Sequence, residues 1–224
     1  SALNITFVGI GLCLLCSAII SFIAIQLRSV QENNVVLDMQ KKIVSSAGLD
    51  EVYGSVENAM SNIKTLIIDL DRGEIVDINP DTYELSKELR EDGKYKFLSA
   101  EEDVASIKKR EKYSKVYIEY KDNEINTLIL PVRGYGLWGI LYGYLAIEGD
   151  FNTVAGLEFY EHKETPGLGA EIDNPKWKAL WKGKKIYQEN GEVSLKVIKG
   201  SVMKTSDNFS YEIDGLSGAT LTCN

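Results

Sequence analysis

The stretch KVYIEYKDNEINTLILPV, residues 115–132, contains two runs rich in β-branched, aromatic and aliphatic residues. Residues 115–120 and 125–132 have the composition of strands, and the polar residues 121–124 between them have that of a turn. The stretch therefore predicts an antiparallel β-hairpin. Because proline cannot donate a backbone hydrogen bond, Pro131 predicts that the second strand ends there or meets an edge of the sheet.

Further strands and helices are predicted on both sides of this hairpin. Strands are expected at residues 65–70, 74–78, 153–161 and 193–199. Helices are expected from Pro80 to near Gly93 after the cap Asn79, from Ala100 to about Arg110 after the capping box at 99–102, and over 175–181. Since these elements do not alternate as regular βαβ units, the fold class is α+β, with a largely antiparallel sheet and flanking helices.

The N-terminal segment differs from the rest of the chain because residues 1–27 contain no charged side chain. A helix of about 20 residues spans the hydrocarbon core of a membrane. A secretory signal would have a shorter apolar region and a small-residue cleavage site, which is absent after Ile25. We expect a transmembrane anchor at 1–27, a stalk helix at 28–48 that ends at Gly48, and a folded domain at 49–224.

Composition excludes several kinds of function. The 25 Lys and Arg against 33 Asp and Glu give a net charge of −8, which is unlike the basic surface of a nucleic-acid-binding protein. A single histidine, His162, excludes a multi-histidine metal site. The sequence has no glycine-rich phosphate loop of the form G-x-x-x-x-G-K-[ST]. No metal site and no catalytic residue are expected.

Two short runs have an unusual density of glycine and hydroxyl residues: ETPGLG at 164–169 and DGLSGAT at 214–220. The first could be an ordinary surface turn, because Pro-Gly suits the centre of a type II turn. Alternatively, its backbone N–H groups and apolar tip could hold a flat heteroaromatic ring. The second run presents hydroxyls on a backbone with little side-chain bulk, which gives a large phosphate-bearing group access to Thr220.

These runs, together with GLWG at 136–139, resemble the FMN-binding domain family. The anchor, the helix at 33–49 and the continuation 171–177 resemble, more narrowly, the C subunits of sodium-translocating NADH:quinone oxidoreductases. The resemblance implies that Thr220 carries FMN as a phosphoester, within the Ser217-Gly218-Ala219-Thr220 tetrapeptide. It further implies flavin-pocket roles for a second group of residues: Glu164, Thr165, Gly167, Leu168 and Trp138.

Three residues leave alternatives open. Lys199 is a candidate for a group near the flavin ring or phosphate, and could equally be a solvated strand end. Thr222 also carries a hydroxyl near the attachment site but lies outside the pattern. Ser217 is a poorer acceptor than Thr220 and is expected to hydrogen-bond within the turn.

The resemblance also implies a role. The chain would be a redox subunit, not catalytic alone, that passes single electrons through FMN inside a multisubunit membrane complex of NADH:quinone reductase. Its partners would be a second flavin subunit, an iron–sulfur carrier and a flavin transferase that matures the protein. A single helix without an intramembrane carboxylate offers no sodium path.

Two alternatives remain at the level of sequence. One is the flavin-carrying G subunit of an Rnf-type ferredoxin:NAD oxidoreductase, which shares the Thr220 motif and the run at 164–169. The other is an anchored binding domain without flavin. Orientation is also open, because Arg28, Lys41 and Lys42 after the anchor favour a cytoplasmic domain. The resemblance implies instead a single-pass protein of the bacterial inner membrane with a periplasmic domain.

Overall fold

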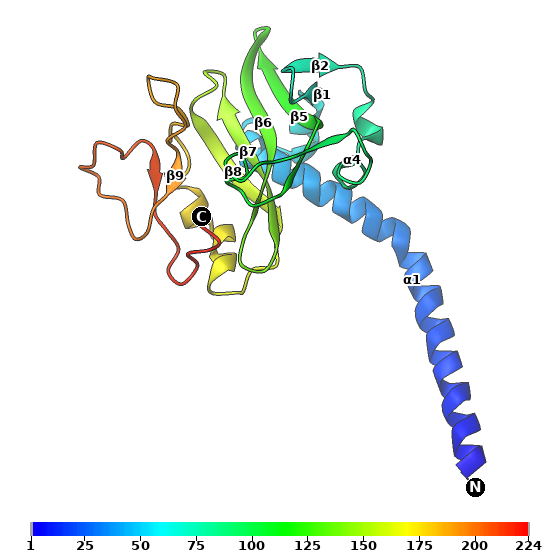
Figure 1. The fold of residues 1–224 in the computed structure, drawn as a ribbon. Coiled ribbons are helices and arrows are strands. Elements are labelled where there is room, and N and C mark those ends of the chain that lie inside the picture. The colour runs from blue at the N-terminus through cyan, green and yellow to red at the C-terminus, as the bar shows by residue number, and fades with distance from the viewer. Residues whose placement is uncertain (1, 224) are drawn as a thin grey trace. The chain divides into compact units, whose positions relative to one another are not determined.

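The fold of the computed structural model, which describes residues 2–223, is shown in Figure 1. Helix α1 covers Ala2–Ser46 and contains one candidate membrane span, Thr6–Ser46. The chain divides into two compact units, with the boundary after Gln40. The first unit is a helix long and apolar enough to cross a membrane, with a mean hydropathy of 2.6 in its most apolar window.

The second unit, from Lys41 onward, is built on a six-stranded sheet in the order β2-β1-β5-β6-β7-β8. All neighbouring strands in this sheet are antiparallel. The strands are β1 (Ile63–Asp69), β2 (Glu74–Val76), β5 (Tyr113–Lys121), β6 (Glu124–Tyr135), β7 (Ile140–Glu148) and β8 (Val154–Glu161). The predicted fold class, α+β with a largely antiparallel sheet, is confirmed.

The hairpin predicted over residues 115–132 forms as β5 and β6. Its turn residues Asp122 and Asn123 have φ values of 52° and 66°, the left-handed conformation that a two-residue type I′ turn requires. Beyond it, β6 runs through Pro131, which lies opposite Tyr144 of β7. The pairing of β6 with β5 reaches only as far as Ile129. The strand therefore does not end at Pro131, but the proline lies where β6 has lost its neighbour on one side.

The two faces of the sheet are covered by different parts of the chain. Side chains alternate between the faces of a strand, and on β7 Tyr144 and Ala146 point to one face while Leu141 and Leu145 point to the other. The first pair packs with Ile43, Val44, Leu49 and Ala59, from the end of α1 and the short helices α2 (Leu49–Tyr53) and α3 (Val56–Ser61). The second pair packs with the C-terminal part of the chain, including Ile172, Trp177 and Ile213.

The segment between β2 and β5 departs from the prediction. The helix expected from Pro80 to near Gly93 forms as η1 (Pro80–Thr82) and α4 (Leu85–Glu88), with extended backbone between them. Asn79 caps η1 as expected, accepting from Asp81 N at 2.9 Å. The Tyr83 hydroxyl donates to the carbonyl of Tyr113 at 2.8 Å. This tertiary contact holds the chain extended where local propensity favours a continuous helix.

The prediction of a helix from Ala100 to about Arg110 is wrong, although the capping box at its predicted start forms. Ser99 N donates to Glu102 and Glu102 N donates to the Ser99 hydroxyl. The Asp103 carboxylate then accepts from the amides of Ile107 and Lys108, an alternative to helical hydrogen bonds that aspartate can offer. The chain turns back there into β4 (Lys109–Glu111), which pairs with β3 (Tyr95–Phe97).

Glu102 in this turn should titrate at unusually low pH. Its hydrogen bond with Lys96 Nζ, at 2.6 Å, lowers the pKa of the carboxyl to about 2, from a usual value of 4.5. Because the folded pKa is depressed, the contact stabilises the turn above about pH 4.5 and is lost as the pH falls towards 2. An NMR titration should show the Glu102 pKa rising in Lys96→Met. An equal pKa in both proteins would contradict this assignment.

The C-terminal part contains shorter elements than the sequence predicts. They are η2 (Gly169–Asp173), α5 (Pro175–Lys178), β9 (Lys196–Val197) and β10 (Glu212–Ile213). The helix expected to reach residue 181 ends at Lys178, and the strand expected over 193–199 pairs over two residues. β9 and β10 form a separate parallel pair, so most of this region is held by loop contacts.

Candidate functional site

The attachment segment, residues 214–220, follows β10 and is fixed at its start by three hydrogen bonds. Trp177 Nε1 donates to the carbonyl of Asp214 at 2.7 Å, and Val202 N donates to the Asp214 carboxylate at 2.7 Å. Gly215 N donates to the carbonyl of Gly200 at 2.8 Å. The acid of the run thus organises the loop that precedes Thr220.

Gly215 packs directly against the neighbouring backbone. A Cβ at this position would lie 2.2 Å from the carbonyl oxygen of Ile198. We expect Gly215→Ala to destabilise the full chain by about 1–3 kcal/mol, which lowers Tm by roughly 2–12 °C for a domain of this size. Thermal unfolding in detergent measures this. Gly134→Ala is the matched control, because its Cβ would meet no atom closer than 3.8 Å, and equal Tm values in both variants would contradict the prediction.

Thr220 is exposed, whereas its neighbour Ala219 is buried, with 4% of its surface accessible. Thr220 lines a cavity of about 410 Å³, within the range of small-molecule sites. Several predicted residues share this cavity: Lys199, Ser217, Gly218 and Thr220. Lys199 is exposed there. The Ser217 hydroxyl makes no hydrogen bond with residues 2–223, so the bond expected inside the turn is absent.

The run at 164–169 forms the turn that its Pro-Gly pair predicts. Gly167 has a φ of 76°, and Leu168 N donates to the carbonyl of Thr165 at 3.1 Å. Trp138 Nε1 donates to the Thr165 hydroxyl at 3.0 Å. This bond joins the turn to the β6–β7 connection, which contains Trp138.

The Glu164 carboxylate is buried where three segments meet. Its Oε1 accepts from Trp138 N at 3.0 Å, and its Oε2 accepts from the Thr222 hydroxyl at 2.5 Å. Two glycines leave room for it, since a Cβ at Gly136 or Gly169 would lie 2.7 Å or 2.3 Å from a carboxylate oxygen. One glycine of each run, Gly136 of GLWG and Gly169 of ETPGLG, is thus explained by close approach to Glu164.

The attachment segment and the turn at 164–169 also contact each other near Leu168. A Cβ at Gly218 would lie 2.9 Å from Leu168 Cδ2, and Gly218 has a φ of 76°. Four large apolar side chains in this region are each about half exposed: Leu137, Trp138, Leu168 and Leu221. The sequence runs that were predicted to form one site therefore lie together, with an apolar surface around them.

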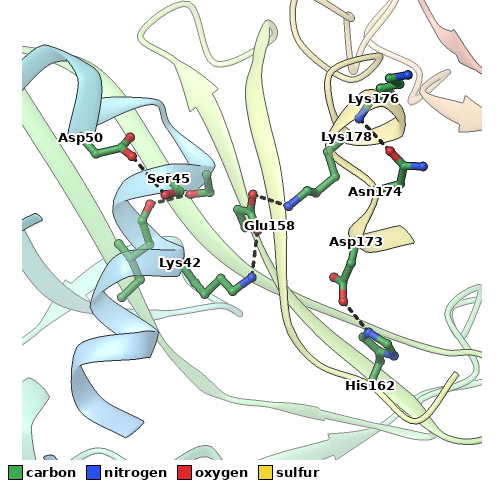
Figure 2. Close-up of polar contacts among 11 residues, drawn as sticks. Lys42, Ser45, Asp50, Glu158, His162, Asp173, Asn174, Lys176 and Lys178 are labelled. Atoms are coloured by element: carbon green, nitrogen blue, oxygen red, sulfur yellow. Dashed lines mark hydrogen bonds and ion pairs between the residues drawn. The ribbon is translucent and has the colours of Figure 1, made fainter. Parts of the chain in front are cut away.

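Two groups of polar contacts involve β8 and the residue that follows it, His162 (Figure 2). His162 Nδ1 accepts from Glu164 N at 3.2 Å, and its Nε2 lies 2.8 Å from the Asp173 carboxylate. Nε2 therefore carries the proton that Asp173 accepts. On β8 itself, the half-buried Glu158 pairs with Lys42 of α1 and Lys178 of α5 (Figure 2).

One buried cation lies behind the attachment segment. Burial lowers the pKa of Lys184, while the nearby carboxylates of Asp214 and Glu212 oppose this shift. Lys184 Nζ donates to the carbonyl of Phe209 at 2.6 Å and lies 4.0 Å from the centre of its ring. Lys184 is thus engaged in holding the loop before β10.

Comparison with known proteins identifies the chain. Residues 136–224 match the model of the FMN-binding domain family. The chain is 46% identical over 220 residues to the C subunit of the Na(+)-translocating NADH-quinone reductase of Pseudomonas aeruginosa, covering 96% of this chain and 84% of the relative. It belongs to this family, NqrC. The corresponding protein of Vibrio vulnificus is 42% identical, with coverage of 97% of this chain and 84% of the relative.

Solved structures of the NqrC family have the same fold. The crystal structure of Shewanella oneidensis NqrC matches with a TM-score of 0.72 at 30% identity, covering 82% of this chain and 84% of that one. The corresponding protein from Parabacteroides distasonis matches with a TM-score of 0.63 at 29% identity, with coverage of 88% and 87%. The family resemblance drawn from the sequence is confirmed. The roles of individual site residues stay predictions.

Sequence reasoning assigned no role to two residues that hold the site together. Thr222 was considered only as a rival acceptor, and its bond to Glu164 joins positions 58 residues apart. Trp177, 7% exposed, binds the Asp214 carbonyl through its indole nitrogen. The tryptophan in the 171–177 continuation was the available signal, because a buried indole N–H needs an acceptor.

Proposed function

We propose that this chain is a membrane-anchored redox subunit of a Na(+)-translocating NADH-quinone reductase, and that Thr220 carries FMN as a phosphoester. The observation that carries this proposal is the placement of Thr220. It is an exposed hydroxyl residue on a tight, glycine-containing turn, and it lines a cavity of about 410 Å³ in the part of the chain that matches the FMN-binding domain.

The residues around Thr220 suit a phosphoester. Gly215 and Gly218 leave the approach to Thr220 with little side-chain bulk, and Lys199 supplies one cation in the same cavity. An exchangeable FMN would need its phosphate held by several basic groups or a helix N-terminus. A covalent link supplies a high effective concentration without them, and the ester lowers the charge of the phosphate to about −1.

Bound FMN would supply the capacity to accept and give up electrons one at a time. The chain's own residues would position it: Thr220 as the point of attachment, with Ser217, Gly218 and Lys199 around the phosphate. Thr165, Gly167, Leu168 and Trp138 would form the adjoining wall, held in place through Glu164. Protein side chains at such a site tune the potential of the cofactor and do not perform the chemistry.

The partners follow from the same proposal. A flavin transferase would load Thr220, and electrons would pass between this subunit, an iron–sulfur carrier and a second flavin subunit. We further propose the division into an anchor (1–27), a stalk helix (28–48) and an FMN-binding domain (49–224). The protein would cross the inner membrane once and place the domain in the periplasm, where free FMN is scarce and covalent retention matters most.

Peptide mass spectrometry of the protein from its native membrane tests the central claim. The peptide that contains Thr220 should be heavier by FMN minus water, and fragmentation should place the addition on Thr220. A stoichiometric native complex with unmodified Thr220 would refute covalent attachment. It would support the alternative of an anchored binding domain without covalent flavin.

A further inference from the structure

Within the described residues 2–223, one hydrogen bond joins the segment 216–223 to another part of the chain. Within residues 2–223, the backbone bonds of this segment are internal: Ala219 N donates to Leu216, and both Thr222 N and Cys223 N donate to Ala219. The single bond to another segment is that from the Thr222 hydroxyl to Glu164 Oε2, at 2.5 Å.

Glu164 is built to receive this bond. Its side chain is buried, with 6% of the residue exposed, and no ion pair within residues 2–223 involves it. Oε1 is already held by Trp138 N. A buried carboxylate needs hydrogen-bond donors in place of water, so Oε2 depends on Thr222. The space between Gly169 and Thr222 is closed, because a Cβ at Gly169 would lie 2.8 Å from the Thr222 hydroxyl.

Thr220 and Thr222 therefore have opposite environments on one turn. Thr220 is exposed, whereas the hydroxyl of Thr222 faces inward to a buried carboxylate. On the other side of Thr220, Ala219 is buried. Thr220, which lines the cavity, therefore lies between two residues that are held in place, Ala219 and Thr222.

We propose that Glu164 and Thr222 form a clasp that holds the turn bearing Thr220, which makes Thr222 a positioning residue for the flavin. The inference rests on the proposed attachment of FMN to Thr220. In this clasp the Glu164 carboxylate binds Thr222 and the Trp138 amide, and it does not bind the flavin ring. The clasp fixes the attachment turn against the β6–β7 connection before loading and limits the motion of the cofactor afterwards.

Hydrogen exchange of the unloaded full-length protein in detergent tests the clasp directly. Thr222→Val keeps the shape of the side chain and removes the hydroxyl. Amides in the peptide covering 216–223 should then exchange roughly 10- to 100-fold faster, the loss expected for a hydrogen bond to a charged group. Thr222→Ser should restore slow exchange, and the exposed Thr205→Val is the matched control. Unchanged exchange in Thr222→Val would overturn the proposal.

A double-mutant cycle tests whether the effect of Thr222→Val arises from the bond to Glu164. Thr222→Val should have little further effect on exchange in a Glu164→Ala background, because the bond is already lost; full additivity would contradict the clasp. In protein loaded by the transferase, Thr222→Val should also lower the fluorescence anisotropy of the flavin, and Thr222→Ser should not. If wild-type Thr220 carries no flavin, the proposed function fails, while the exchange of the unloaded protein still decides whether the clasp exists.

Discussion

A Thr220→Ala variant, produced together with the flavin transferase, should carry no covalently bound flavin. The phosphoester needs a hydroxyl at the exposed position of the turn, and alanine removes it while the neighbouring contacts of Ala219 and Thr222 remain. We expect the loss to be complete, because the family resemblance assigns the phosphoester to Thr220 and not to Ser217, although both line the same cavity. The measurement is in-gel flavin fluorescence of the denatured protein, followed by mass spectrometry of the peptide.

Two further variants identify the acceptor. Thr222→Ala should keep flavin on Thr220, since the Thr222 hydroxyl donates to Glu164 and Thr222 does not line the cavity that contains Thr220. Ser217→Ala should also keep it. Thermal unfolding of unloaded Thr220→Ala should match the wild type, because Thr220 is exposed. Flavin retained in Thr220→Ala and lost in Thr222→Ala would move the attachment site to another residue.

The parts of the fold that could be predicted are those specified by neighbouring residues. The hairpin of β5 and β6 was readable because its strands are separated by a short polar turn, where Asp122 and Asn123 accept positive φ values. The type II turn at Pro166-Gly167 was readable for the same reason. In both places the chemistry of a few adjacent residues determines the backbone.

The wrongly predicted helices and strands lie where contacts with distant or competing residues determine the backbone conformation. The capping box at Ser99 formed without its helix, because Asp103 took the amides of Ile107 and Lys108. The run at 193–199 formed a two-residue strand, β9, because among the described residues it pairs with β10 alone.

The candidate site, like the fold, was predicted where neighbouring residues determine the structure and missed where distant contacts do. Its three runs were found in the sequence, but the contacts that join them were not. The bond between Thr222 and Glu164 spans 58 positions, and the bond between Trp177 and Asp214 spans 37. No local pattern specifies such pairs, because the fold of the intervening chain brings them together.

Arg133→Met should be strongly destabilising. Arg133 on β6 forms an ion pair with Glu111 of β4 and donates to the carbonyl of Lys109 at 2.8 Å. Both side chains are nearly buried, with 7% and 11% exposed. Removing the arginine leaves a buried carboxylate without its counter-charge, which costs about 3–5 kcal/mol. The corresponding fall in Tm is roughly 6–20 °C, measurable by thermal unfolding of the full chain in detergent.

The double variant Arg133→Met with Glu111→Leu separates this cause from lost packing. If the unpaired charge is responsible, removing the carboxylate as well should recover most of the stability, because apolar replacement of a whole buried pair is often nearly neutral. A double variant as unstable as the single one would show that packing of the arginine dominates. The pair also matters for the site, since β6 continues from Arg133 to Tyr135 and into the connection that carries Trp138. We therefore expect the single variant to lose flavin loading in proportion to its unfolded fraction, and the double variant to regain it.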